Sequence, residues 1–162
     1  MFPMLILLLA VLLPSLALSV PAPLNRSTGC TNGMITSSEG TMCYKIINAR
    51  EDYQTARQFC SWVGIVFKNV GANAASIHST ADNELTRKKM AHMYWLGASF
   101  VDGKWTWDDL SDFDYSNWVA GGPNPSKGHC IAVDHITGLW TSRDCTDKLS
   151  AMCEMKPKVH EL

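Results

Sequence analysis

The stretch Trp-Leu-Gly-Ala-Ser-Phe-Val-Asp-Gly-Lys-Trp-Thr-Trp-Asp-Asp, residues 95–109, carries the clearest structural signal in this sequence. Two short apolar or aromatic pieces, Trp95–Gly97 and Trp105–Trp107, stand here among residues that favour turns. Similar pieces recur at residues 131–133, 139–140 and 151–153. The second half of the chain is therefore expected to form short strands joined by turns and loops.

Two helices are expected earlier in the chain. Residues 44–47 form a strand candidate, and Asn48 with Glu51 resembles the capping box that opens a helix. Apolar side chains then recur every three or four residues, at Tyr53, Ala56, Cys60 and Val63. The second helix is expected to begin at Ser79 or Thr80, because acidic residues and then basic residues follow, as the helix dipole favours. Helices followed by short strands predict an α+β domain.

The N-terminus predicts a secreted protein. It is apolar and uncharged, and its length fits the core of a signal peptide better than a membrane span. Small residues at Ala17 and Ser19 suit a cleavage that makes residues 1–19 a signal peptide, with an uncleaved membrane anchor as the alternative. Residues 20–29 then form a linker, in which Asn25 begins a glycosylation sequon.

All six cysteines follow this leader, at Cys30, Cys43, Cys60, Cys130, Cys145 and Cys153. An even number in a secreted chain predicts three disulfides, although counting alone leaves their connectivity open. The sequence has no CxxC or HExxH spacing for zinc and no recognisable catalytic nucleophile. A formal net charge of −1 without charge runs favours neither nucleic acid nor an anionic membrane as partner.

The order of these pieces resembles that of the C-type lectin-like domains, from Cys30 to Glu154. The matching motifs are Cys43-Tyr44, Ala75-Ser76-Ile77-His78-Ser79, Asn83-Glu84, Trp95-Leu96-Gly97-Ala98, Trp105-Thr106-Trp107-Asp108-Asp109, Tyr115-Ser116-Asn117-Trp118, Gly122-Pro123-Asn124, Gly138-Leu139-Trp140 and Cys153-Glu154. The resemblance implies the long form of this α+β fold, with two helices, short antiparallel sheets and a long irregular loop. The domain is expected to span residues 30–156, followed by a short tail at 157–162.

The resemblance also implies which cysteines pair and which aromatic residues are buried. The implied disulfides are Cys30–Cys43, Cys60–Cys153 and Cys130–Cys145. The tryptophans expected in the core are Trp95, Trp107, Trp118 and Trp140. Trp105 is expected to point away from the partners of Trp107.

Sugar-binding members of the family hold a calcium ion through carboxylates and amides, and most of these are missing here. The corresponding positions are Gly122-Pro123-Asn124, Gly128 and Thr141-Ser142. Of these, Asn124 alone keeps an amide oxygen, whereas Ca²⁺ takes about 6–8 oxygens and favours carboxylates. We therefore expect no metal and no cofactor at this primary site. The acidic residues of 108–114, namely Asp108, Asp109, Asp112 and Asp114, form either a shifted calcium site or turn caps.

The expected function is recognition of an extracellular glycan or protein by a secreted, monomeric and non-enzymatic protein. The expected contacts come from the loop at 108–129 and the segment beside it, at Asn124, Lys127, His129, Arg143 and Asp144. A calcium-dependent lectin with a shifted site and a non-recognition extracellular structural protein are the alternatives. An apolar insert at residues 62–67 is expected to pack on the domain as an added strand or helix extension, or else to form a partner surface.

Overall fold

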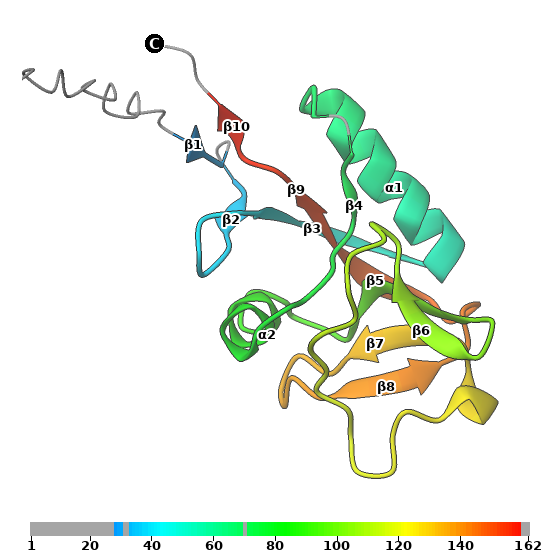
Figure 1. Ribbon diagram of the computed structural model, residues 1–162. Coiled ribbons are helices and arrows are strands. Elements are labelled where there is room, and N and C mark those ends of the chain that lie inside the picture. Colours follow the sequence, from blue (N-terminus) through cyan, green and yellow to red (C-terminus); the bar gives the residue numbers. More distant parts are fainter. Residues whose placement is uncertain (1–27, 31–32, 70, 160–162) are drawn as a thin grey trace, which may run out of the picture.

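The protein was analysed as a computed structural model that describes residues 28–30, 33–69 and 71–159. The predicted signal peptide, Asn25 and most of the predicted linker lie outside the described residues. The elements are, in chain order, β1 (Thr28–Gly29), β2 (Ile35–Thr36), β3 (Cys43–Glu51), α1 (Tyr53–Val66), β4 (Asn73–Ala74), α2 (Thr80–Arg87), β5 (Tyr94–Val101), β6 (Lys104–Trp107), the 3-10 helix η1 (Pro125–Lys127), β7 (Cys130–Val133), β8 (Trp140–Arg143), β9 (Leu149–Met155) and β10 (Lys158–Val159) (Figure 1).

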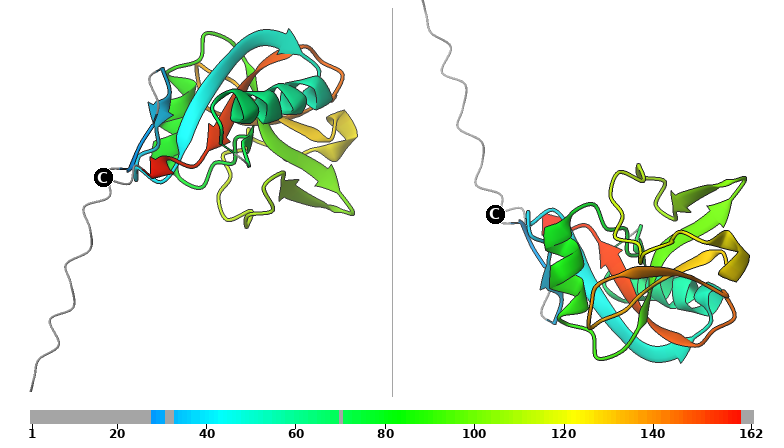
Figure 2. Two further views of the ribbon diagram at one scale, coloured as in Figure 1. Left: turned by 90° about the horizontal axis from the view of Figure 1, so that it is seen from above. Right: turned by 90° about the horizontal axis from the view of Figure 1, so that it is seen from below.

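Strand β9 organises the main sheet. It pairs antiparallel with β3 and β4 and parallel with β5, and the sheet continues through β7 to β8, with β6 added to β5. Among the described strands the β5–β9 pair is the parallel one, so the expectation of antiparallel sheets holds for the other pairs. Helix α1 lies along the sheet on one side, while the long loop and β8 occupy the opposite end of the molecule (Figures 1 and 2).

Helix α1 begins later than the Asn48 capping box predicted. The N-cap is Asp52, whose Oδ1 accepts a hydrogen bond from Thr55 N at 2.9 Å. Residues 48–51 remain in β3 because Glu51 pairs with Leu149 of β9. A local capping signal was thus overridden by strand pairing, although the predicted apolar face of the helix is confirmed.

Helix α2 begins where the sequence predicted. Ser79 is its N-cap and accepts a hydrogen bond from Asp82 N at 3.1 Å. On its inner face, Asn83 Oδ1 accepts a hydrogen bond from Trp140 Nε1 at 2.8 Å, and Asn83 Nδ2 donates to Gly138 O. These bonds satisfy a buried indole nitrogen and tie α2 to β8.

The core is built around the predicted tryptophans. Trp95, Trp107 and Trp140 are fully buried, while Trp118 is half-buried against the same cluster. Trp107 stacks on Phe113 with ring centroids 5.0 Å apart, and Trp140 meets Trp107 edge-on at 5.8 Å. Such offset and edge-on contacts add about 0.5–1.5 kcal/mol each to the burial of the rings.

The three disulfides expected from the resemblance are confirmed, as Cys30–Cys43, Cys60–Cys153 and Cys130–Cys145. Cys60 in α1 and Cys153 in β9 are both completely buried, and their bond closes a 93-residue separation. The Cys130–Cys145 bond joins the end of the long loop to the segment that follows β8. The fold is thus crosslinked both through its core and beside the loop.

The apolar insert at residues 62–67 is a helix extension that packs on the domain through some of its side chains and exposes others. The insert is the C-terminal part of α1, and Val63 and Phe67 pack half-buried against Ala72 and Met155. Trp62, Ile65 and Val66 point outward instead, with exposed fractions of 56%, 74% and 76%.

The two ends of the described chain are paired. β1 and β10 form a two-stranded antiparallel sheet in which Gly29 lies opposite Lys158. This pairing therefore joins residues on both sides of the predicted 30–156 span. Among the described helices, none combines the length and hydrophobicity that a membrane span requires.

Candidate functional site

The long loop, residues 108–129, runs from the end of β6 to the start of β7 and is fixed to β8 at its middle. Trp140 N donates to Asn117 O at 2.8 Å, and Val119 N donates to Trp140 O at 3.0 Å. The loop then passes through the Gly122–Pro123 peptide bond, which is cis, into η1. Backbone hydrogen bonds therefore hold this irregular segment in place on the sheet.

Three of the five predicted contact residues come together. Lys127, His129 and Asp144 line one hollow of about 320 Å³ beside the Cys130–Cys145 disulfide, and all three are exposed. Asp144 Oδ1 accepts hydrogen bonds from Thr146 N at 2.9 Å and Thr146 Oγ1 at 2.8 Å. These bonds hold the pKa of Asp144 below its usual value, so the hollow combines a fixed carboxylate with an exposed amine and imidazole.

The other two predicted contact residues have internal partners. Asn124 Oδ1 caps η1 by accepting hydrogen bonds from Ser126 N at 3.2 Å and Ser126 Oγ at 2.6 Å. Arg143 donates to Asp147 from Nε and Nη2, at 2.8 Å in each case. Neither residue lines the hollow; Asn124 caps η1, and Arg143 forms an ion pair with Asp147.

The positions that carry calcium ligands in sugar-binding members are packed against protein backbone here. A Cβ atom built on Gly128 would lie 1.9 Å from both C and O of Arg143, so the backbone of β8 fills the space where a side chain would stand. The φ of Gly128 is +144°, a conformation that side chains disfavour. Ser142 Oγ accepts a hydrogen bond from Asn124 N at 2.9 Å and faces the loop. The loop is therefore closed against β8 at this place by protein atoms.

The acidic residues of 108–114 are dispersed. Asp108 pairs with Arg57 Nε at 2.7 Å and accepts a hydrogen bond from Tyr53 Oη at 3.2 Å. Asp114 pairs with His78 Nδ1 at 2.7 Å, and Asp112 is exposed. The described residues contain no group of three or more histidine, cysteine or acidic side chains arranged to hold a metal ion. The geometry therefore favours separate structural roles for these carboxylates.

Asp109 belongs instead to a buried acidic pair with Glu154. Ser76 N donates to Glu154 Oε2 at 3.0 Å, and Ser76 Oγ lies 3.0 Å from carboxyl oxygens of both Glu154 and Asp109. One hydroxyl hydrogen cannot serve two carboxylates at once. Burial, together with the nearby charge of Asp109, raises the pKa of Glu154 to about 9. At neutral pH Glu154 therefore carries a proton and hydrogen-bonds to Asp109, whose own pKa is lowered.

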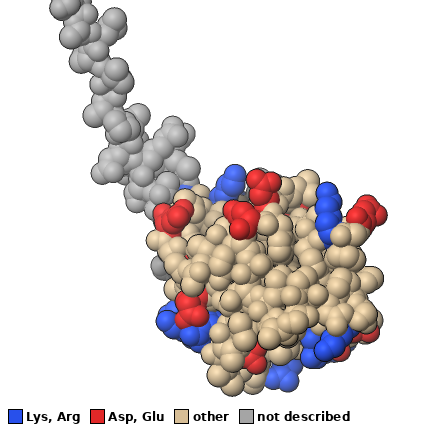
Figure 3. Space-filling view, turned by 60° about the horizontal axis from the view of Figure 1, so that its bottom comes forward, with Lys and Arg blue, Asp and Glu red and all other residues tan. Residues whose placement is uncertain are grey.

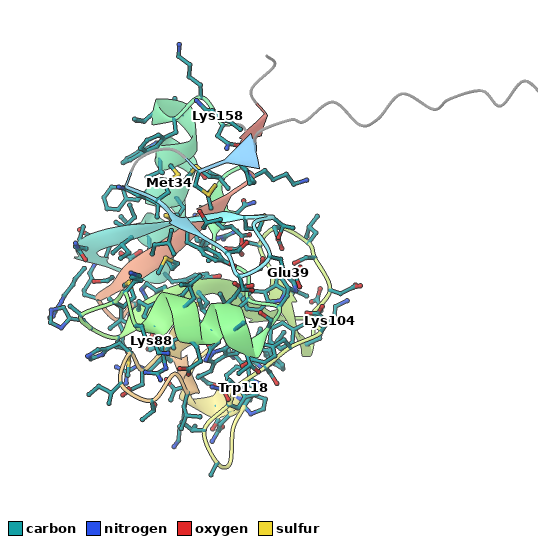
Figure 4. All side chains as sticks on the ribbon, turned by 90° about the vertical axis from the view of Figure 1, so that its left-hand side faces the viewer. Met34, Glu39, Lys88, Lys104, Trp118 and Lys158 are labelled. Atoms are coloured by element: carbon teal, nitrogen blue, oxygen red, sulfur yellow. A yellow bond between two sulfur atoms is a disulfide. The ribbon has the colours of Figure 1, made fainter. Side chains whose placement is uncertain are left out.

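A row of aromatic rings runs beside the loop, which the sequence reasoning missed. The rings of His129 and Phe100 are 5.7 Å apart, those of Phe100 and Trp105 are 5.3 Å apart, and those of Trp105 and Trp118 are 5.1 Å apart. All but His129 are half-buried. We call these four residues the aromatic row; Trp118 lies at the loop end of the molecule in Figure 4.

The expected direction of Trp105 was wrong. Residues two apart on a strand share a face, so Trp105 and Trp107 lie on the same side of β6 and both pack against the core cluster. A sequence signal for the row exists in Asp102-Gly103, whose φ values are +49° and +81°. An Asp-Gly pair predicts a two-residue hairpin turn, which places Phe100 opposite Trp105 as observed.

A second hollow adjoins the first. It measures about 520 Å³ and shares His129 and Cys145 with the first hollow. Tyr53, Arg57 and Lys148 contribute to its lining, but Arg57 is paired with Asp108 and Lys148 with Asp52 at 2.8 Å. Seen from the loop end, the surface is mostly neutral, with charged side chains mainly toward its edges (Figure 3).

Comparisons with known proteins establish the family. The lectin C-type domain profile matches residues 49–155, which is more than half of the chain, so the protein belongs to the C-type lectin domain family. A relative described as "C-type lectin mannose-binding isoform", from Notechis scutatus scutatus, is 30% identical over 152 residues, covering 86% of this chain and 92% of that protein. C-type lectin lectoxin-Lio1 from Erythrolamprus poecilogyrus is 29% identical over 134 residues, covering 76% and 78%.

Solved structures confirm the predicted fold. A calcium-independent type II antifreeze protein has a TM-score of 0.71 and 23% identity, covering 83% of this chain and 99% of that one. The C-type lectin domain of murine dendritic cell inhibitory receptor 2, in complex with an N-glycan, has a TM-score of 0.67 and 22% identity, covering 79% and 99%. At these identities the comparison shows a shared fold. The two relatives found by sequence are described as C-type lectins, which are not an enzyme family.

Proposed function

We propose that this protein is an extracellular recognition protein that binds a carbohydrate or protein ligand through direct contacts from the long loop, without calcium at the family's primary site. The observation that carries the proposal is the contact of Gly128 with the backbone of Arg143. This contact leaves no room for a ligating side chain at residue 128, and the other positions where the family holds calcium, residues 122–124 and 141–142, have no carboxylate. The proposal treats the protein as a monomer that acts without a cofactor.

The aromatic row and the first hollow support a ligand with both apolar and polar faces. Half-exposed aromatic rings provide flat apolar area, and their neighbours Lys127 and Asp144 offer a hydrogen-bond donor and an acceptor. A pyranose ring presents such a combination of C–H faces and hydroxyl groups. A protein ligand with an exposed loop presents it too, since aromatic anchors dominate many protein interfaces.

Binding to a glycan array and to immobilised serum glycoproteins, with and without chelator, tests the proposal. The triple variant Lys127→Ala, His129→Ala and Asp144→Ala should lose binding while its melting temperature stays nearly unchanged, because exposed substitutions cost little stability. A matched variant, Lys89→Ala, His92→Ala and Glu39→Ala, changes exposed residues of similar type elsewhere and should bind like wild type.

The outcomes separate the candidate functions. Binding that survives the chelator supports the proposal, and its loss after enzymatic deglycosylation of the glycoproteins assigns a glycan ligand. Binding abolished by the chelator would point to a calcium-dependent lectin with a shifted site. Absence of binding to every probe would favour a non-recognition structural role, for which the neutral surface at the loop end is the supporting observation.

A further inference from the structure

The exposed C-terminal end of α1 is a second surface that the loop site does not use. Trp62, Ile65 and Val66, which we call the α1 tip, lie within the last two turns of the helix and are all more than half exposed. Phe59 extends the apolar area, with its ring 5.3 Å from that of Trp62. Single exposed apolar residues are ordinary on proteins, but three large ones on one helix end mark an interaction surface.

Lysines from two distant parts of the chain border the α1 tip. Lys68 follows the helix directly, and with Ile65 it lines a hollow between the helix and β4. Asn69 Nδ2 donates to Lys156 O at 2.6 Å, which brings the C-terminal segment with Lys156 and Lys158 to the same end of the molecule. Asn69 also lines the neighbouring hollow together with both of these lysines.

The surroundings of the α1 tip are basic. Among the described residues, those lining the two hollows that meet at Asn69 include three lysines and no acidic residue. The whole chain has a net charge of −1, so this local excess of positive charge arises from the fold. A tryptophan and aliphatic side chains beside lysines form the pattern that suits the boundary of an anionic bilayer.

We propose that the α1 tip, with Lys68, Lys156 and Lys158, binds the surface of an anionic lipid membrane. A second copy of the chain fits the surface less well, because a two-fold contact through the tip would bring like-charged lysines together. Lys158 and Trp118 lie at opposite ends of the molecule in Figure 4. A protein bound to lipid through the α1 tip would therefore leave the long loop exposed for its own ligand.

Flotation of the secreted, disulfide-bonded protein with vesicles tests this proposal. Binding is expected to vesicles of phosphatidylcholine with 30% phosphatidylserine, about tenfold or more above pure phosphatidylcholine, and to fall as salt is raised. Lys68→Gln and Lys156→Gln should each weaken binding about fivefold, which corresponds to about 1 kcal/mol per lysine near the surface. Lys104→Gln changes an exposed lysine on β6 and should leave binding unchanged.

The apolar contribution is tested with the variant Trp62→Ser, Ile65→Ser and Val66→Ser. It should lose vesicle binding, whereas Leu110→Ser with Ile136→Ser, which changes residues 88% and 71% exposed elsewhere, should retain it. An unchanged circular dichroism spectrum and an unchanged melting temperature would show that the triple variant is folded. Equal flotation of wild type and triple variant overturns the proposal. Absence of flotation by the wild type also overturns it. If sedimentation then shows that the wild type forms a dimer and the triple variant does not, the α1 tip binds a second copy of the chain instead.

Discussion

The free energy of unfolding of the wild type should fall as the pH rises, because Glu154 is a buried acid. Replacing Glu154 by glutamine should remove most of this fall. The pKa of Glu154 is about 9 in the folded protein against an ordinary value of 4.5. A raised pKa means that the folded state binds the proton more tightly, so the stabilisation is complete below pH 4.5 and is lost as the pH rises toward 9. Between these pH values the folded state binds almost one proton more than the unfolded state. The free energy of unfolding therefore falls by about 1.4 kcal/mol per pH unit. From pH 6 to pH 8 this amounts to at most about 3 kcal/mol.

The assay is thermal unfolding of wild type and Glu154→Gln at pH 6, 7 and 8. Glutamine can donate to Asp109 as the protonated acid does, so the two proteins should be similarly stable only below pH 4.5, and at pH 6 the variant should already be more stable by about 2 kcal/mol. From pH 6 to pH 8 the difference in melting temperature should grow by up to about 10 °C for a domain of this size. Glu39→Gln, at an exposed position, should follow wild type throughout. A difference between wild type and Glu154→Gln that stays constant with pH would refute the reasoning, because it would mean that Glu154 is ionised in the folded protein across this range.

Three further predictions concern the loop. Gly128→Ala should lower the free energy of unfolding by more than about 2 kcal/mol in urea denaturation, because its Cβ would overlap the Arg143 carbonyl; a neutral effect would contradict the closed loop. Replacing Cys130 and Cys145 together by alanine should cost about 3 kcal/mol in the same assay, since the bond closes a 15-residue separation; a loss below about 1 kcal/mol would show that the loop is held without it. Millimolar calcium or excess chelator should change the melting temperature by less than about 1 °C, because an ion without a tight site cannot stabilise the folded state; a rise of several degrees would contradict the proposed calcium-free site.

The framework of the fold was predictable because its signals are either local or shared across the family. Ser79 caps α2 as expected, since no strand competes for that segment. The burial of Trp95, Trp107 and Trp140 was expected from the family resemblance and is confirmed. The cysteine count gave only the number of disulfides, and their pairing came from the resemblance. Asn48 failed as a cap because β9, about a hundred residues later in the chain, pairs with its segment.

The candidate site was less predictable because its properties depend on contacts between segments. Three of the predicted contact residues, Lys127, His129 and Asp144, line one hollow. The other two are hydrogen-bonded to neighbouring side chains, Asn124 to Ser126 and Arg143 to Asp147. Polar residues in a loop look alike in the sequence, and only folding decides which of them face solvent. The aromatic row was missed for the same reason, because it combines residues from separate parts of the chain. The apolar residues of the α1 tip were visible in the sequence at 62–67, but the lysines near them come from a distant segment and were not.

The loop suggests how direct binding could replace a metal-bridged contact. In a calcium site, carboxylates must be drawn together and the ion offsets their repulsion. Here the same segment is held by the Asn124 cap, by the hydrogen bond from Asn124 N to Ser142 and by the packing of Gly128 against β8. Each of these contacts is made between the protein's own atoms, and contacts of this kind reduce the conformational entropy that a loop loses when it binds a ligand. The proposed calcium-free site is therefore preorganised by the protein itself, and its affinity should respond to changes in the first hollow and the aromatic row rather than to the metal content of the solution.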